Sequence, residues 1–88
     1  MNESATAIEQ QLRAVLAADA VEVIDESAQH AGHAGARGGG HYAVTVVSEQ
    51  FAGKGPVERH RMVYAALDDA MRLRIHALSI RAFSPEEL

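Results

Sequence analysis

Histidine is the residue type in this sequence with the clearest potential for chemistry. The chain of 88 residues contains five histidines but no cysteine. A neutral imidazole is a common ligand of transition metals. The absence of cysteine excludes a disulfide framework, a thiol nucleophile and a metal site built from the chain's own thiolates. Any thiolate ligand would therefore come from a partner molecule. The five positions are His30, His33, His41, His60 and His76.

A cluster of basic residues at the start of a predicted helix is the second candidate site. It comprises Lys54, Arg59 and Arg61, with Arg72 and Arg74 near the far end of the same helix. Cations at a helix N-terminus oppose the helix dipole, so Arg59 and Arg61 do not serve helix stability. They could pair with Glu58, bind phosphate or form a solvated face. The net charge of −4 disfavours tight nonspecific binding to DNA but leaves room for a local basic face.

The composition limits the remaining classes of function. Hydrophobic residues make up 48% and charged residues 23% of the chain, with no apolar run of membrane-spanning length and no apolar leader at residues 1–10. We therefore expect a single domain over residues 1–88, in the cytoplasm and without a membrane partner. An enzyme is disfavoured because no nucleophile stands near a base, and because Gly38–Gly40 is not followed directly by a phosphate-binding helix.

The elements that position these residues begin with a helix and two strands. Apolar residues at helical spacing predict a helix over Thr6–Ala18, with a capping box formed by Thr6 and Glu9 at its start. Segments rich in β-branched residues predict strands over Val21–Asp25 and His41–Ser48.

A long loop and a second helix follow the same logic. Ser27–Gly40 carries five of the seven glycines, which predicts a mobile Gly/His-rich loop between the two strands. Glu49–Gly55 is a compact turn that directs Phe51 into the core, and Pro56 starts a helix that runs to about Arg72. The predicted buried stripe of this helix consists of Val63, Tyr64, Leu67, Ala70 and Met71.

A third strand over Arg74–Phe83 completes an α+β fold of two layers, and Ser84–Glu87 is a further helix-start signal. The order helix, strand, strand, helix, strand predicts a three-stranded mixed sheet with helices on one face. The first two strands should be antiparallel, and a right-handed helical crossover should make the second and third parallel. The end of the first strand and the starts of the other two then share one end of the sheet with His30, His33, His41 and His76. One face of the third strand should carry His76, Leu78, Ile80 and Ala82.

Several short motifs, spread from about Ile8 to Glu87, together resemble the BolA family. They are Asp25-Glu-Ser-x-x-His30, Gly40-His-Tyr42, Val47-Ser-x-x-Phe51, Arg59-His-Arg-Met-Val-Tyr64 and Ile75-His-Ala-Leu-Ser79. The resemblance implies a class II KH-like fold. It also implies an adaptor that binds a monothiol glutaredoxin and shares a glutathione-coordinated [2Fe–2S] cluster with it, in iron–sulfur trafficking or in iron and stress regulation. The alternative that it implies is a DNA-binding transcriptional regulator of stress response and cell morphology, for which the basic cluster would be the contact surface.

Carried over residue by residue, the resemblance assigns cluster ligation to two histidines. The C-terminal ligand falls on His76 and the loop ligand on His30, with His33 as an alternative to His30. Two histidines can replace two thiolates on one iron of such a cluster. The remaining ligands would come from the partner and glutathione, so we expect the isolated chain to bind no cluster. Without the resemblance, His76 could be a hydrogen-bonded histidine at the core edge and the other two could be solvated. We expect no RNA binding, because Gly53–Gly55 is one residue too short for the Gly-x-x-Gly signature of KH domains.

Overall fold

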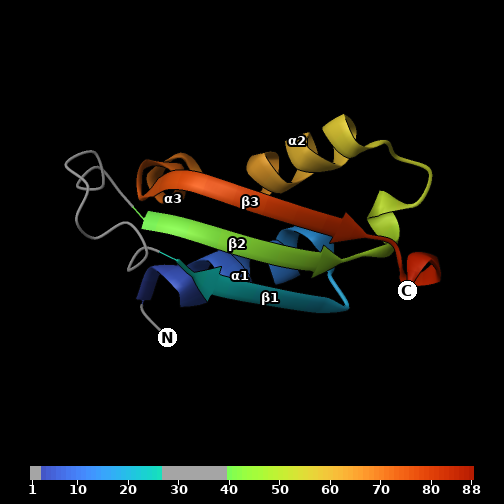
Figure 1. Cartoon of the computed structure of the whole chain (residues 1–88), viewed down its shortest axis with the longest axis horizontal. Helices are drawn as coiled ribbons and strands as arrows, with labels where there is room; N and C mark the ends of the chain where they lie inside the picture. The colour runs from blue at the N-terminus through green and yellow to red at the C-terminus, as the bar shows by residue number, and fades with distance from the viewer. Residues whose placement is uncertain (1–2, 27–39) are drawn as a thin grey trace.

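A mixed sheet of three strands carries the helices on one of its faces (Figure 1). The computed structural model describes residues 3–26 and 40–88, and for Glu3, Ala70 and His76 the backbone alone. The strands lie in the order β1-β2-β3, with β1 antiparallel and β3 parallel to β2, which confirms the predicted α+β fold. In chain order the elements are α1 (Glu3–Leu16), β1 (Ala20–Asp25), β2 (Gly40–Val47), η3 (Glu49–Phe51), α2 (Pro56–Ala66), α3 (Asp69–Leu73), β3 (Ile75–Phe83) and η4 (Pro85–Glu87).

The hydrophobic core lies between the sheet and the helices. Tyr42, Val44 and Val46 alternate along β2 and are at most 5% exposed, as expected for a strand with one covered face. The turn after β2 places Phe51 in the core, as predicted from its sequence. The other members of this core are Ala5, Ile8, Leu12, Leu16, Val21, Val63, Ala66, Leu67 and Met71.

The first helix begins earlier than the sequence predicts. α1 starts at Glu3, so Thr6 and Glu9 lie inside the helix and the predicted capping box at its start is wrong. The side chain of Glu9 instead accepts a hydrogen bond from Arg13 Nε at 3.2 Å, one helical turn later. This exposed pair contributes little to stability, as is usual for ion pairs on helix surfaces.

The end of α1 is fixed by a left-handed residue and by a buried serine. Ala17 has a φ of 48°, and the amide of Ala18 donates to the Arg13 carbonyl at 3.2 Å, which is the geometry of a Schellman motif. Ser48 is fully buried, and its hydroxyl donates to the Leu16 carbonyl at 2.7 Å. The helix therefore ends at Leu16, two residues before the predicted end. The hydrogen bond from Ser48 holds this end next to the end of β2.

The predicted helix over residues 56–72 consists of two helices, α2 and α3. The break lies at Leu67, whose side chain is fully buried, and Asp68, which starts the next helix. The Asp68 carboxylate accepts a hydrogen bond from the Met71 amide at 2.7 Å and so caps α3. Gln11 of α1 holds the same aspartate through its side-chain amide, at 3.2 and 3.3 Å. The contact with Gln11 comes from a distant helix, and the cap formed by Asp68 does not alter the apolar periodicity, so periodicity alone could not reveal the break.

Tyr64 is not part of the buried stripe that the sequence predicts for α2. The tyrosine is 40% exposed, because Val63 and Ala66 occupy the inward side and each helical residue turns by about 100° from the last. The prediction for the Ala70 side chain lies outside the described residues. Within the described part of the chain, none of the helices is long and apolar enough to cross a membrane.

Candidate functional site

The end of β1 and the starts of β2 and β3 meet at one end of the sheet, as predicted (Figure 1). Two hydrogen bonds between backbone groups tie these three strand ends together. The amide of Glu26 donates to the His41 carbonyl at 2.7 Å, and the amide of Gly40 donates to the Arg74 carbonyl at 2.9 Å. Gly40, assigned to the loop from the sequence, is thus the first residue of β2.

The three predicted cluster ligands are only partly covered by the described structure. His30 and His33 belong to residues 27–39, which lie outside it, and His76 is described by its backbone alone. That backbone occupies the second position of β3, at the end of the sheet where residues 27–39 connect β1 to β2. Joint ligation by His76 and either of the other two histidines therefore stays a prediction.

The pairing of β2 with β3 is irregular beside His76. The register partners on either side are Gly40 with Ile75 and His41 with Ala77. His76 is therefore an additional residue on β3, as in a β-bulge, a feature that is common next to functional sites. The bulge also resets the alternation of faces, because Ile75 and Leu78 both pack against the core although they are three residues apart.

At this end of the sheet, Gly40 cannot be replaced by a residue with a side chain unless its surroundings rearrange. A Cβ atom built on Gly40 would lie 2.5 Å from Cε2 of Tyr42, whose ring is only 5% exposed. The Gly40-His-Tyr42 motif therefore has a packing reason, because the tyrosine ring lies against the bare backbone of the glycine.

Leu73, the last residue of α3, is exposed near this end of the sheet. Its side chain is 80% exposed, whereas Met71 of the same short helix is 4% exposed and belongs to the core. Leu73 precedes His76 by three residues. Among the described residues, no group of three or more histidine, aspartate or glutamate side chains could hold a metal ion. A metal centre here would thus depend on the side chains of His30, His33 and His76, which lie outside the described part of the structure.

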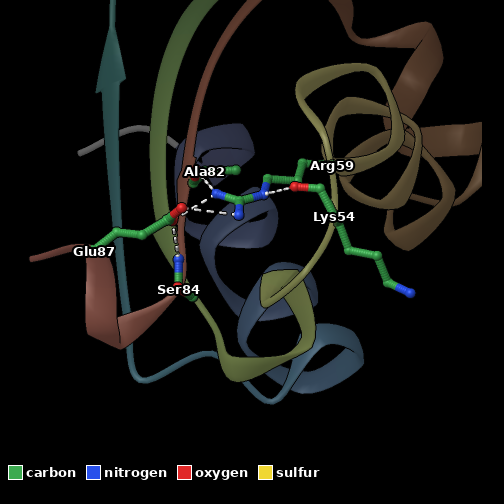
Figure 2. Close-up of polar contacts among 5 residues, drawn as sticks. All are labelled: Lys54, Arg59, Ala82, Ser84 and Glu87. Atoms are coloured by element: carbon green, nitrogen blue, oxygen red, sulfur yellow. Dashed lines mark hydrogen bonds and ion pairs between the residues drawn. The ribbon is translucent and has the colours of Figure 1, made fainter.

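The basic cluster is built around Arg59, whose guanidinium donates hydrogen bonds to other groups of the same chain (Figure 2). Its Nη1 and Nη2 donate to the two carboxylate oxygens of Glu87 at 2.6 and 3.0 Å. Nε donates to the Lys54 carbonyl at 2.8 Å, and Nη1 also donates to the Ala82 carbonyl at 3.0 Å. The guanidinium carbon lies 6.0 Å from the centre of the Phe51 ring. With 12% of its side chain exposed, Arg59 joins the start of α2 to β3 and the C-terminal turn.

The other members of the basic cluster remain on the surface. The possible pairing of Arg59 with Glu58 is wrong, because Glu58 lies 3.7 Å from the ammonium of Lys54 instead. Figure 2 shows the Lys54 side chain pointing away from Arg59, and Arg61 is exposed without an ion pair among the described residues. A surface pocket of about 230 Å³ lies beside this cluster and is lined by Lys54, Pro56, Arg59, His60, Ala82 and Glu87.

The basic cluster around Arg59 and the predicted [2Fe–2S] cluster ligand His76 lie at opposite ends of β3. Arg59 contacts Ala82 near the end of the strand, whereas His76 stands at its start. Ala82 comes six residues after His76 along the extended strand, a distance of about 20 Å at the usual rise per residue. One small ligand cannot bridge the two.

Glu87 is the residue of this region whose role the sequence did not reveal. It lies 28 residues from Arg59, and the only local signal was the helix-start pattern Ser84-Pro-Glu-Glu87. That pattern does form a capping box, in which Glu87 also accepts the Ser84 amide at 2.7 Å. The hydrogen bonds from Arg59 and then from Ser84 lower the pKa of Glu87 from 4.5 to about 2.

We expect Glu87→Gln to lower the midpoint of urea denaturation at pH 7 and to remove part of its dependence on acid. The folded protein releases the Glu87 proton more readily than the unfolded chain, so this contribution to stability is complete above about pH 4.5 and is lost as the pH falls towards 2. The midpoints of wild type and Glu87→Gln should therefore converge progressively as the pH falls from about 4.5 towards 2. Glu86→Gln, a neighbouring exposed change, is the control, and equal effects of both variants would contradict the assignment.

Comparison with known proteins points to the same family. The model of the family described as "BolA-like protein" matches residues 12–87. The SufE-like protein 1 of Arabidopsis thaliana is 45% identical over 74 residues, which cover 77% of this chain but only 20% of that protein. The transcriptional regulator BolA of Escherichia coli, which is named as DNA-binding, is 36% identical over 80 residues, covering 91% of this chain and 74% of that protein.

Solved structures agree with the sequence matches. The BolA domain of SufE1 from Arabidopsis thaliana superposes with a TM-score of 0.85 and 39% identity, covering 100% of this chain and 99% of that one. The solution structure of BolA1 from Mus musculus has a TM-score of 0.80 and 36% identity, covering 99% of this chain and 69% of that one. The resemblance in the short motifs, the fold and these similarities lead to one conclusion: the chain belongs to the BolA family.

Proposed function

We propose that this chain is an adaptor that binds a monothiol glutaredoxin and shares a glutathione-coordinated [2Fe–2S] cluster with it. In this role it would act in iron–sulfur cluster trafficking or in iron and stress regulation. The names of its BolA-like relatives do not describe enzymes, which is compatible with an adaptor.

The observation that carries the proposal is the arrangement of strands around His76. The start of β3 lies at the same end of the sheet as the end of β1 and the start of β2, which residues 27–39 connect along the chain. Those residues include both candidate loop ligands, His30 and His33. The bulge in β3 lies at His76 itself, so the regular pairing with β2 is interrupted at the position of the proposed ligand.

The donor set of the chain fits half of such a cluster. Histidine pairs replace two cysteines on one iron in some [2Fe–2S] centres, and the chain supplies histidines but no cysteine. The other two ligands would be a cysteine of the glutaredoxin and the thiol of glutathione. When bound, the cluster would supply iron and sulfide for transfer, while His76 and a loop histidine would each contribute a neutral imidazole.

Docking of the glutaredoxin is expected to use the exposed side chain of Leu73. Leu73→Asp should weaken binding of the glutaredoxin in the absence of cluster by roughly tenfold. The reason is that an apolar side chain that would become buried in the complex is replaced by a charge. Val57→Asp, at a 65% exposed position on α2 near the opposite end of the sheet, is the matched control and should bind like wild type. Isothermal titration calorimetry measures both. Wild-type affinity of Leu73→Asp, or equal weakening by the two variants, would contradict docking at the His76 end.

DNA binding is the second candidate function. Relatives in Escherichia coli and Vibrio cholerae are named DNA-binding transcriptional regulators, and Lys54 and Arg61 expose two cations near the start of α2. Arg59 supports this function less, because its guanidinium is bound to Glu87. A salt-dependent gel shift on promoter DNA tests this candidate without involving the histidines.

A further inference from the structure

The face of the sheet opposite the helices carries a pattern of side chains that is complementary to itself. Figure 1 views the sheet with α1 behind the strands. The register places residues of the three strands in rows across this open face. One row is Glu22, Thr45 and Arg81, and the next is Ile24, Ala43 and Ser79.

Opposite charges stand on the two outer strands of the first row. Glu22 on β1 and Arg81 on β3 are separated by Thr45 on β2, a distance of about 10 Å for two strand spacings. Both charged residues are exposed, and neither forms an ion pair within the described part of the chain. Each charge is therefore available to a partner.

The middle of the open face is low and partly apolar. Ala43 and Thr45 on the central strand are small, and Ile24 on β1 is 49% exposed. A shallow hollow of about 260 Å³ lies on this face, and its lining includes all six residues of the two rows. A second sheet can approach a floor of small side chains to the usual distance of about 10 Å between stacked sheets.

We propose that this face is a homodimer interface, in which a second copy of the chain stacks sheet on sheet about a twofold axis parallel to β2. This rotation places β1 of each copy over β3 of the other and β2 over β2. Because the rotation keeps each row opposite itself, Glu22 meets Arg81 of the partner subunit, and the same ion pair forms a second time by symmetry. Ile24 meets Ser79 of the partner subunit, while Ala43 and Thr45 lie opposite their own copies.

The charges select this axis over the other one that lies in the plane of the interface. An axis perpendicular to the strands would place β1 over β1 and β3 over β3, and so bring like charges towards each other. The two rows make a small surface compared with the roughly 800 Å² per partner of standard interfaces. The dimer should therefore be weak, and its ion pairs should make it weaker still at high salt.

Sedimentation equilibrium of three charge variants tests the pairing. We expect the wild type to self-associate at high protein concentration and low salt. Glu22→Arg alone and Arg81→Glu alone should be monomeric, because each brings two pairs of like charges together. An equimolar mixture of these two variants should associate again, because in the mixed dimer each arginine of the first variant lies opposite a glutamate of the second. Glu58→Arg, on the helix layer and with the same change in net charge as Glu22→Arg, is the control that should associate like wild type.

Three results would overturn the proposal: a wild type that stays monomeric at the highest concentration and lowest salt, single variants that associate like wild type, or a mixture that does not associate. Circular dichroism confirms that each variant is folded. The interface lies on the sheet face away from α3, so this test is independent of glutaredoxin docking.

Discussion

Leu67→Ala is expected to lower the free energy of unfolding by about 2–5 kcal/mol, as is typical when a fully buried leucine is truncated. Leu67 is 0% exposed and lies at the junction of α2 and α3, where both helices meet the core. The loss comprises the transfer free energy of the removed atoms and the cavity that they leave. Because small domains have a margin of only about 5–15 kcal/mol, a substantial fraction of the variant could be unfolded at elevated temperature.

The matched control for this prediction is Leu73→Ala. The same atoms are removed from the neighbouring helix, but Leu73 is 80% exposed, so the free energy of unfolding should change by no more than about 0.5 kcal/mol. Urea denaturation followed by circular dichroism measures both changes. Similar losses for Leu67→Ala and Leu73→Ala would contradict the assignment of the core.

His76→Ala is expected to abolish the shared cluster while leaving the domain folded and able to dock. The variant would remove one proposed imidazole ligand, while every residue of the described hydrophobic core stays in place. Iron and sulfide content of the complex with a glutaredoxin should therefore fall towards the value for the glutaredoxin without this chain. The affinity of the two proteins without cluster should stay close to that of wild type.

The two histidines of residues 27–39 should behave differently in the same assay. His30→Ala should lower the cluster content more than His33→Ala, because the spacing of His30 from Asp25 matches the family motif, and each histidine should partly replace the other. The double variant should then resemble His76→Ala. Since a ligating imidazole must be neutral, loss of the wild-type cluster should accelerate as the pH falls below about 6.5.

Local patterns in the sequence were sufficient to predict the strands and their topology. The alternation in residues 41–48 reports directly which side of β2 is covered, and the helical crossover forces β3 to be parallel to β2. The end of the sheet to which His76 belongs could therefore be predicted before any coordinates. The buried position of Leu67 was predicted from the helical spacing of apolar residues after Pro56, and that of Phe51 from the compact turn that contains it.

Features that depend on distant partners could not be predicted in this way. The break between α2 and α3 involves Gln11 of α1, and the partner of Arg59 lies near the C-terminus rather than at the adjacent Glu58. The bulge at His76 is also a property of two paired strands, which a single strand pattern does not contain. In each case the deciding contact joins segments that are far apart in sequence.

Visible circular dichroism of the reconstituted complex is the most direct test of the proposed shared cluster. Wild-type chain, a monothiol glutaredoxin, iron, sulfide and glutathione would be mixed, and the spectrum compared with that of the glutaredoxin reconstituted alone. We predict a distinct spectrum for the wild-type mixture, because imidazole replaces thiolate on one iron, and loss of that difference with His76→Ala. A His76→Ala mixture with the same spectrum as wild type would contradict ligation by His76 and would favour the DNA-binding alternative.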